Sequence, residues 1–203
     1  MQNKKSLAQF AGRSLGAALA AFVMIGCQTS NDRSSATNQT AATTAAPREK
    51  EAPRPTIRIK TGVASPLTDS SGNVWLPDQG FADGETIERP ELAIENTKDP
   101  AIYRAERYSM TKFSQKLPDG KYIVKLHFCE TFEGITGPGQ RVFSLNVEGK
   151  EFKDFDVWAK TGGAQRAYVE TVSVDIADGS LDITFTPNIE NPEINGIEIV
   201  PSP

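Results

Sequence analysis

The chain has 203 residues, which is enough for one domain with a sizeable hydrophobic core. Its formal net charge is -4, and it falls to about -7 without the first 26 residues, which carry three basic side chains and no acidic one. An acidic domain without basic clusters does not attract nucleic acid or anionic lipid headgroups, so neither is an expected partner.

Residues 1–26 predict an export signal. A basic start is followed by an apolar run from Leu15 to Ile25, which is too short to span a bilayer as a mature helix. A transmembrane anchor is therefore the weaker alternative. The run closes with Met24-Ile25-Gly26-Cys27, which resembles the cleavage box of bacterial lipoproteins.

This resemblance implies cleavage before Cys27 and acylation of its sulfur and new amino group, with a lipid bilayer as partner. Several acyl chains together anchor a protein stably. The residue after the cysteine is Gln28 and not an aspartate, which in enteric-type bacteria implies the outer membrane. The implied location is the bacterial cell envelope, with the outer membrane or exported surface favoured. Ordinary secretion with a free Cys27 is the alternative.

Residues 27–56 predict a disordered linker. Small polar residues and alanine dominate up to Ala46, and prolines and charged residues follow up to Pro55. Such a segment buries too little apolar surface to offset the entropy lost on ordering. We interpret it as a spacer that holds a folded domain, residues 57–203, away from the anchor.

The domain alternates apolar and polar residues with a period of two, which is typical of β-strands. The alternation covers residues 122–128, 143–148, 171–176, 181–185 and 197–199. Lys125 and His127 lie on the polar face of the first of these segments. Turn sequences separate the segments, namely Pro118-Asp119-Gly120, Glu148-Gly149-Lys150 and Asp178-Gly179. The pattern predicts an all-β fold, an antiparallel β-sandwich of the jelly-roll kind, with long loops in residues 61–100.

Cysteines and histidines are too few for a disulfide framework or a zinc site. Cys129 lies in a strand pattern and is predicted to be a small buried apolar residue. His127 is the only histidine, whereas zinc needs three or four ligands. A structural calcium ion would find carboxylates in the loops, at Asp69, Asp78 or Asp83. Their spacing matches no calcium-binding motif, so no cofactor is predicted.

Several short motifs, in their order along residues 57–200, resemble the malectin family of carbohydrate-binding domains. The motifs are Tyr103 to Tyr108, Gly120 to Glu130, Gln140 to Phe143, Asp156-Val157, and Asn191 to Ile199. No single motif is specific, but the series in order is. The resemblance implies a malectin-like sandwich whose loops at one end bind a sugar, with a glucosyl oligosaccharide as the family's ligand.

The resemblance places the family's sugar-binding positions on Tyr108, Phe132, Glu133 and Glu190 and, with poor register, near Phe81. Glu133 replaces an aromatic residue, and Glu190 replaces an aspartate. Sugar binding is therefore expected here, but the family's glucosyl specificity does not carry over.

The residue types suit a sugar. An aromatic ring covers the C–H face of a pyranose, and carboxylates accept hydrogen bonds from its hydroxyls. Glu130 ends a strand beside the loop with Phe132 and is expected to bind hydroxyls, with an ion pair to Arg141 or Arg107 as the alternative.

Two other pairs of residues are weaker candidates. Arg104 and Arg107 lie three positions apart and face opposite sides of one strand, so at most one can face the site. Trp75 and Trp158 are interpreted as buried rather than as stacking platforms.

The sequence predicts a monomeric, non-catalytic carbohydrate-binding lipoprotein. A glycosidase needs two opposed carboxylates, and no pair of acidic residues stands out for that role. The sequence also contains no nucleophile elbow and no phosphate-binding loop. A cell-surface module that recognises another protein through the same loops remains the second alternative.

Overall fold

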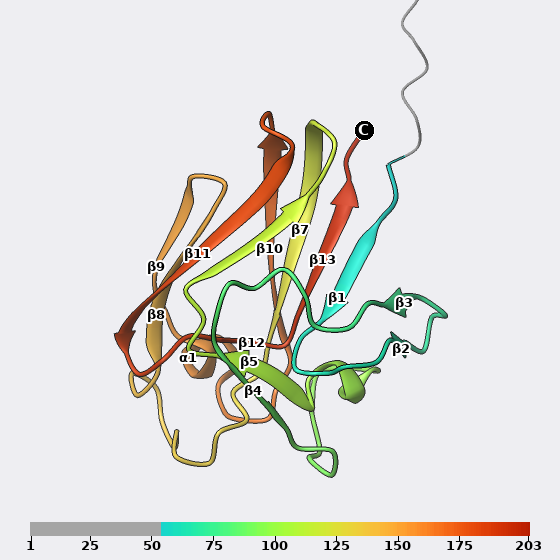
Figure 1. Ribbon diagram of the computed structural model, residues 1–203. Helices are drawn as coiled ribbons and strands as arrows, with labels where there is room; N and C mark the ends of the chain where they lie inside the picture. Colours follow the sequence, from blue (N-terminus) through green and yellow to red (C-terminus); the bar gives the residue numbers. More distant parts are fainter. Residues whose placement is uncertain (1–53) are drawn as a thin grey trace, which may run out of the picture. The chain divides into compact units, whose positions relative to one another are not determined.

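The computed structural model describes residues 54–203, so the predicted signal, Cys27 and nearly all of the predicted linker lie outside the described residues. Strands dominate this part of the chain (Figure 1). Its helical elements are the 3-10 turn η1 (Pro100–Ile102) and the five-residue helix α1 (Val157–Thr161). Neither approaches the length or apolarity that a membrane-spanning helix requires.

Two four-stranded antiparallel sheets form the body of the domain. The first contains, in spatial order, β1 (Ile57–Lys60), β13 (Gly196–Pro201), β7 (Gly120–Phe128) and β10 (Tyr168–Ile176). The second contains β6 (Lys112–Lys116), β11 (Ser180–Ile189), β8 (Val142–Val147) and β9 (Lys150–Phe155). The predicted all-β sandwich is confirmed.

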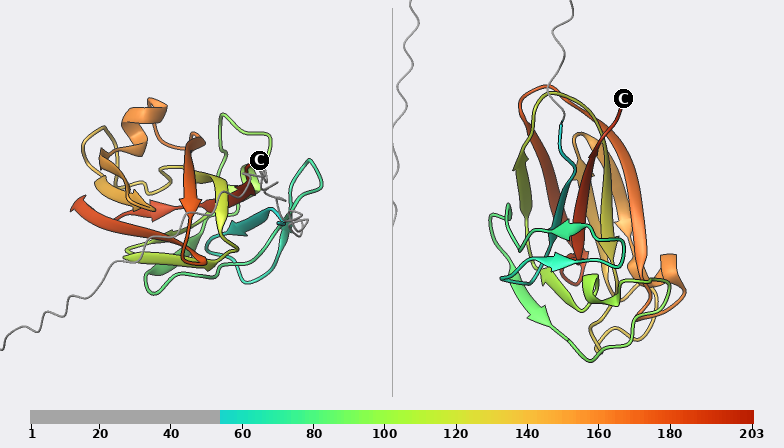
Figure 2. Two further views of the ribbon diagram at one scale, coloured as in Figure 1. Left: turned by 90° about the horizontal axis from the view of Figure 1, so that it is seen from above. Right: turned by 90° about the vertical axis from the view of Figure 1, so that its right-hand side faces the viewer.

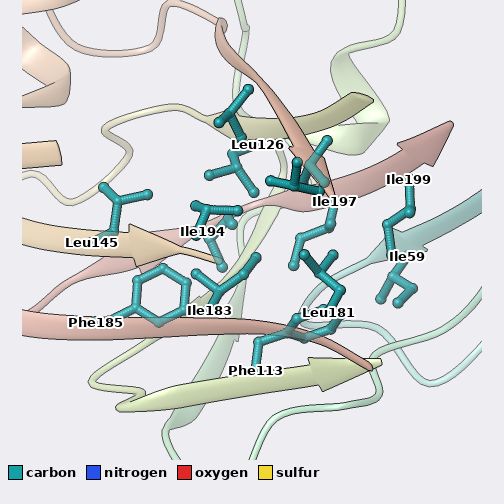
Figure 3. Close-up of a cluster of buried hydrophobic side chains, with 14 of the residues drawn as sticks. Ile59, Phe113, Leu126, Leu145, Leu181, Ile183, Phe185, Ile194, Ile197 and Ile199 are labelled. Atoms are coloured by element: carbon teal, nitrogen blue, oxygen red, sulfur yellow. The ribbon is translucent and has the colours of Figure 1, made fainter. Parts of the chain in front are cut away.

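The core lies between these sheets because each strand turns its apolar set inward. Figure 3 shows Leu126 and Ile197 of the first sheet near Leu145, Ile183 and Phe185 of the second. All five side chains are 3% exposed or less. The period-two pattern therefore identified the buried face correctly.

The predicted turns hold these strands in register. Between β8 and β9, Glu148 and Gly149 have φ angles of 51° and 78°. Two consecutive positive φ values match the tight hairpin turn whose twist suits antiparallel strands. The expected turn at this position is confirmed.

Residues 61–100, predicted as long loops, also contain short strands. A hairpin joins β2 (Leu67–Thr68) to β3 (Val74–Trp75), and β4 (Glu85–Glu88) pairs with β5 (Ala105–Tyr108). On its other side β5 pairs with β12 (Glu193–Ile194), which gives a three-stranded sheet with β4 at its edge. These strands are too short for alternation to be visible in the sequence.

A second apolar cluster covers part of the first sheet's outer face. It contains Trp75, Ile102, Tyr103 and Cys129. The prediction that Cys129 is buried is confirmed, and burial raises the pKa of its thiol well above the usual value.

The same cluster buries His127, which the alternation had placed on the polar face. His127 is 6% exposed, and its ring lies 5.1 Å from the Trp75 ring at 87°. Its two nitrogens lie within hydrogen-bond distance of Tyr103 Oη (2.9 Å) and Glu198 Oε1 (3.2 Å). A buried ring is thus accommodated because both polar atoms have partners.

The small sheet and α1 lie at one end of the sandwich. The start of β1 and the C terminus lie at the opposite end in the side views of Figures 1 and 2. Loops that follow β7 and β11 also reach the end with α1. The fold therefore gathers β4, β5, α1 and these loops far from the point where the chain enters the domain.

Candidate functional site

Two adjoining cavities form a groove at the end of the sandwich that carries α1. The first, of about 250 Å³, lies between β5 and the loops after β7 and β11. The second, of about 610 Å³, lies between the loop after β7 and the segment from α1 to β10. Ile87, Arg89 and Phe132 line both cavities, so the two are compartments of one groove.

Three of the predicted site residues meet in the first cavity. They are Tyr108, Phe132 and Glu190. Tyr108 ends β5 opposite both Glu85 and Glu193 in the strand register, so the small sheet fixes its backbone. Phe132 is 42% exposed, although contact of an apolar side chain with water is unfavourable. An exposed aromatic beside a tyrosine makes an apolar platform on which a ligand can lie.

Glu190 stands at the rim of this cavity with φ of 64°, a backbone region that non-glycine residues rarely adopt. Its Oε1 accepts hydrogen bonds from the backbone N–H of Asn191 at 3.0 Å and from the Asn191 side chain at 3.1 Å. Its Oε2 makes no hydrogen bond within residues 54–203. One acceptor therefore remains for a ligand hydroxyl.

Glu130 lies beneath the groove and lines neither cavity. It is 1% exposed, its Oε2 accepts from Arg141 Nε at 2.7 Å, and its Oε1 accepts from the Phe132 backbone N–H at 2.9 Å. Burial raises the pKa of Glu130, although the Arg141 charge and both hydrogen bonds act in the opposite direction. The ion pair with Arg141, which was the alternative interpretation, is present, and Glu130 does not line the groove.

Phe81 lies outside the groove. Its ring packs against Phe113, with centroids 5.0 Å apart, and the Arg107 guanidinium lies 5.1 Å from the ring centre. Phe81 therefore does not line this groove, and its expected contact with a ligand stays a prediction. The early loop that carries it is pinned to β6 by the Phe81–Phe113 bridge.

Glu133 lines the second cavity, where its carboxylate makes no hydrogen bond with any residue from 54 to 203. Trp158 of α1 lines the same cavity and is only partly buried, whereas Trp75 is 1% exposed. The interpretation of both tryptophans as buried holds for Trp75 and fails for Trp158. A five-residue helix gives no visible period, so the sequence could not show which way Trp158 faces.

Arginines line the groove, but not the two that the sequence singled out. Arg104 donates to the Leu92 carbonyl at 2.8 Å, and Arg107 pairs with Asp78 at 3.1 Å. Arg89 and Arg141 line the first cavity instead. Arg89 follows an exposed edge strand directly, and nothing in the local sequence marks it.

Buried charges form the floor of the first cavity. Arg89 Nη1 lies 3.2 Å from Glu106 Oε1, and Arg141 pairs with Glu130. Glu193 belongs to the same cluster, is 0% exposed, and neither of its carboxylate oxygens has a hydrogen-bond partner. Burial, then the negative charges of Glu106 and Glu130, raise the pKa of Glu193 well above its usual value. Burial without a hydrogen-bond partner thus favours the protonated form of Glu193.

The three loop aspartates anchor backbone. Asp69 accepts from Asn73 N at 2.9 Å, Asp78 from Gly62 N at 2.8 Å, and Asp83 from Thr111 N at 2.6 Å. Across residues 54–203 no three His, Cys, Asp or Glu side chains converge in a way that could hold a metal ion.

Comparison with known proteins assigns the domain to a family. The family model of the Malectin domain matches residues 56–197, which is most of the chain. This chain belongs to the malectin domain family. The match covers the sandwich, the small sheet and both cavities of the groove, so the malectin domain includes the whole candidate site.

The relatives of this malectin domain are parts of larger proteins. The chain is 35% identical over 108 residues to a probable receptor-like protein kinase of Arabidopsis thaliana. The matched region covers 44% of this chain and 13% of the kinase. Two solved structures share the fold at 20% identity. A β-glucuronidase of Bacteroides uniformis has a TM-score of 0.67 over 73% of this chain and 18% of that one. The plant peptide RALF23 in complex with FER and LLG2 has a TM-score of 0.63 over 71% of this chain and 48% of that one.

The regions that resemble this chain thus lie within larger proteins, and one of the solved structures with the same fold is a peptide complex. The kinase and glucuronidase are several times longer than the region they share with this chain. The family and fold together support a recognition module, and they leave its ligand to be argued from the groove.

Proposed function

We propose that this malectin domain binds carbohydrate in its groove without converting it chemically. The observation that carries the proposal is the exposed Phe132 ring beside Tyr108, framed by polar groups that have unused hydrogen-bonding capacity. A sugar ring has an apolar C–H face and a polar edge, so it needs both kinds of group within a few ångströms.

The polar groups of the first cavity differ in how far they are committed. Glu106 and Arg141 are buried and paired, so they hold the cavity's shape. Glu190 and the hydroxyl of Tyr108, which makes no hydrogen bond in the described part of the chain, are available to a ligand. Few charged groups are free, which favours a neutral, hydroxyl-rich ligand over a strongly charged one.

The groove faces away from the entry of the chain into the domain. The first described residues and the C terminus lie at the opposite end (Figures 1 and 2). A domain tethered through the predicted linker and lipidated Cys27 would therefore present its groove outward from a bacterial envelope. We propose this location and a monomeric state together with the binding function.

Peptide recognition is a second candidate because β4 is the outer strand of its sheet and lines both cavities through Ile87. An extended peptide can pair with such an edge. One structural neighbour is also a peptide complex. Competition separates the candidates, since free sugar displaces a glycan ligand from the groove but leaves a backbone-paired peptide in place.

A glycan-array screen of the full chain, purified in detergent, tests the proposal. The Tyr108→Ala, Phe132→Ala double variant is measured beside it, with circular dichroism to show that both proteins are folded. We expect binding to one family of glycans with a Kd of roughly micromolar to millimolar, because a small polar ligand on an open site gains limited free energy. The variant should lose that binding.

Two results would contradict the proposal. A folded protein that binds no glycan would favour the peptide interpretation. Cleavage of a bound glycan in a reducing-end assay would show that the domain is an enzyme, and the non-catalytic proposal would then fail.

A further inference from the structure

The second cavity of the groove is larger than the one that holds Tyr108 and Glu190. Its volume is about 610 Å³, against about 250 Å³ for the first. Pockets that bury a whole small-molecule ligand measure about 300–1,000 Å³, so the first cavity alone is small for a site. A single sugar in the first cavity would leave the larger compartment of the same groove empty.

We propose that the second cavity is a further sugar-binding subsite with Trp158 as its platform, so that the ligand is a linear oligosaccharide that spans both cavities. This inference rests on the proposed function and adds the ligand's class and length. Three observations carry it: the place of the partly buried Trp158 in the wall of the second cavity, the unused polar groups around it, and Arg89 between the compartments.

Trp158 is held outward by the way α1 is built. Asp156 caps the helix through its Oδ1, which accepts from the Ala159 N–H at 3.0 Å, and Val157 anchors it in the core at 1% exposure. The next side chain, Trp158, faces the second cavity and makes no ring contact with residues 54–203. A large apolar ring of this kind favours a flat apolar partner, such as the C–H face of a pyranose.

Polar groups with free hydrogen-bonding capacity lie around Trp158. The carboxylate of Glu133 and the amide of Gln165 make no hydrogen bond within the described residues. The Gln165 backbone is nevertheless rigid, because its N–H donates to the Glu130 carbonyl at 2.9 Å and its carbonyl accepts from Glu95 N at 2.8 Å. Its φ of 57° is unusual for a non-glycine residue. The backbone is thus fixed, while the amide remains free to bind hydroxyls.

Arg89 connects the two compartments. Its Nη1 donates to Thr131 Oγ1 at 2.9 Å and lies 3.2 Å from Glu106 Oε1. Its Nε and Nη2 groups make no side-chain hydrogen bond in residues 54–203, and the residue lines both cavities. A chain of sugars that passes from one cavity to the other would bring its oxygens to these donors.

The test is the dependence of affinity on chain length. Gluco-, manno- and galacto-oligosaccharides of two to six units are titrated into the detergent-solubilised full chain by isothermal calorimetry. In the series that binds, we expect affinity to rise at least fivefold between the dimer and the longer oligomers. Trp158→Ala should remove this increase and leave the dimer's affinity within twofold, whereas Trp158→Phe should retain most of the increase.

A matched variant guards against a merely structural effect of Trp158. Tyr108→Ala should weaken binding of every length to a similar degree, because it removes the platform of the first cavity. Thermal unfolding of all three variants shows whether each remains folded.

The outcomes separate the two proposals. If dimers and hexamers bind equally well, or if Trp158→Ala weakens all lengths alike, the second subsite is wrong and carbohydrate binding stands. If no series binds, carbohydrate binding is wrong and the subsite falls with it.

Discussion

The sandwich core and the floor of the groove are both buried, but opposite kinds of side chain build them. The core between the sheets is apolar, with Leu126 and Ile183 fully buried. The floor of the groove buries Glu106, Glu193 and Arg141 instead. An apolar core gains stability from each contact, whereas buried charges lose solvation and recover it only through partners. The comparison indicates that the buried charged groups at the groove end cost stability that the apolar core supplies.

Removing Arg141 should give the largest effect, because it leaves Glu130 buried without its ion-pair partner. We expect Arg141→Met to lower the free energy of unfolding at pH 7 by about 3–5 kcal/mol. The deficit should shrink as the pH falls, since a protonated Glu130 carries no charge. Urea denaturation at several pH values measures both.

The matched control is Arg166→Met. Arg166 pairs with Glu95 at 3.0 Å, but the two side chains are 40% and 67% exposed. An exposed ion pair contributes about 0–1 kcal/mol, so this variant should unfold almost like the wild type. If Arg141→Met and Arg166→Met lowered the free energy of unfolding equally, the buried ion pair would contribute no more than the exposed one.

Shortening a core side chain should cost nearly as much, but for a different reason. Leu126→Ala deletes a side chain that is 0% exposed, and the cavity it leaves should lower the free energy of unfolding by about 2–5 kcal/mol. This loss should not vary with pH, because no charge is uncovered. A pH-dependent loss would show that the core and the charged floor are coupled.

The contrast also explains what the sequence could predict. The sandwich follows from alternation in β7, β8, β10 and β11, because each inward position faces an apolar core and tolerates little else. Glu106 and Arg141 look like ordinary surface residues in the sequence, since burial of a charge depends on partners brought from other segments of the chain. The same holds for His127, which Trp75 and Tyr103 cover from distant loops.

The candidate site was predictable where the family order fixes a residue's place. Tyr108, Phe132 and Glu190 meet in one cavity as the resemblance implied. Phe81 lies outside that cavity because its loop packs back on Phe113. Arg89 and Gln165 could not be found, because only the fold brings their distant segments together at the groove and nothing in the local sequence marks them.

The unpaired Glu193 should make stability depend on pH in the opposite sense to an ordinary carboxylate. Its pKa in the unfolded chain is near 4.5 and is raised in the folded protein. The folded state therefore holds the proton more tightly. The contribution of Glu193 to stability is therefore highest below about pH 4.5 and falls as the pH rises toward its folded pKa, by up to about 1.4 kcal/mol per pH unit for one proton.

Glu193→Gln removes this dependence, because an amide does not titrate. We expect the variant to gain stability relative to the wild type as the pH rises from 4.5 to 8, as measured by thermal unfolding. Glu85→Gln, at an exposed position on β4, is the control and should leave the wild-type profile unchanged. A wild-type profile that Glu193→Gln does not alter would show that Glu193 is ionised in the folded protein.

The smallest effects should come from removing single tyrosine hydroxyls. In the core this change should lower stability, whereas in the groove it should weaken binding. Tyr122 lies in the core, and its hydroxyl donates to the Pro118 carbonyl at 2.8 Å. Tyr122→Phe should cost about 0.5–1.5 kcal/mol of stability and leave glycan affinity unchanged.

Tyr108 makes no such bond in the described residues and lines the groove. Tyr108→Phe should therefore leave stability within about 0.5 kcal/mol and weaken binding roughly fivefold. Urea denaturation and calorimetric titration on the same preparations measure both. If Tyr108→Phe lowered stability without weakening ligand binding, the Tyr108 hydroxyl would stabilise the fold and would not bind the ligand. The groove would then bind the ligand through its aromatic rings alone.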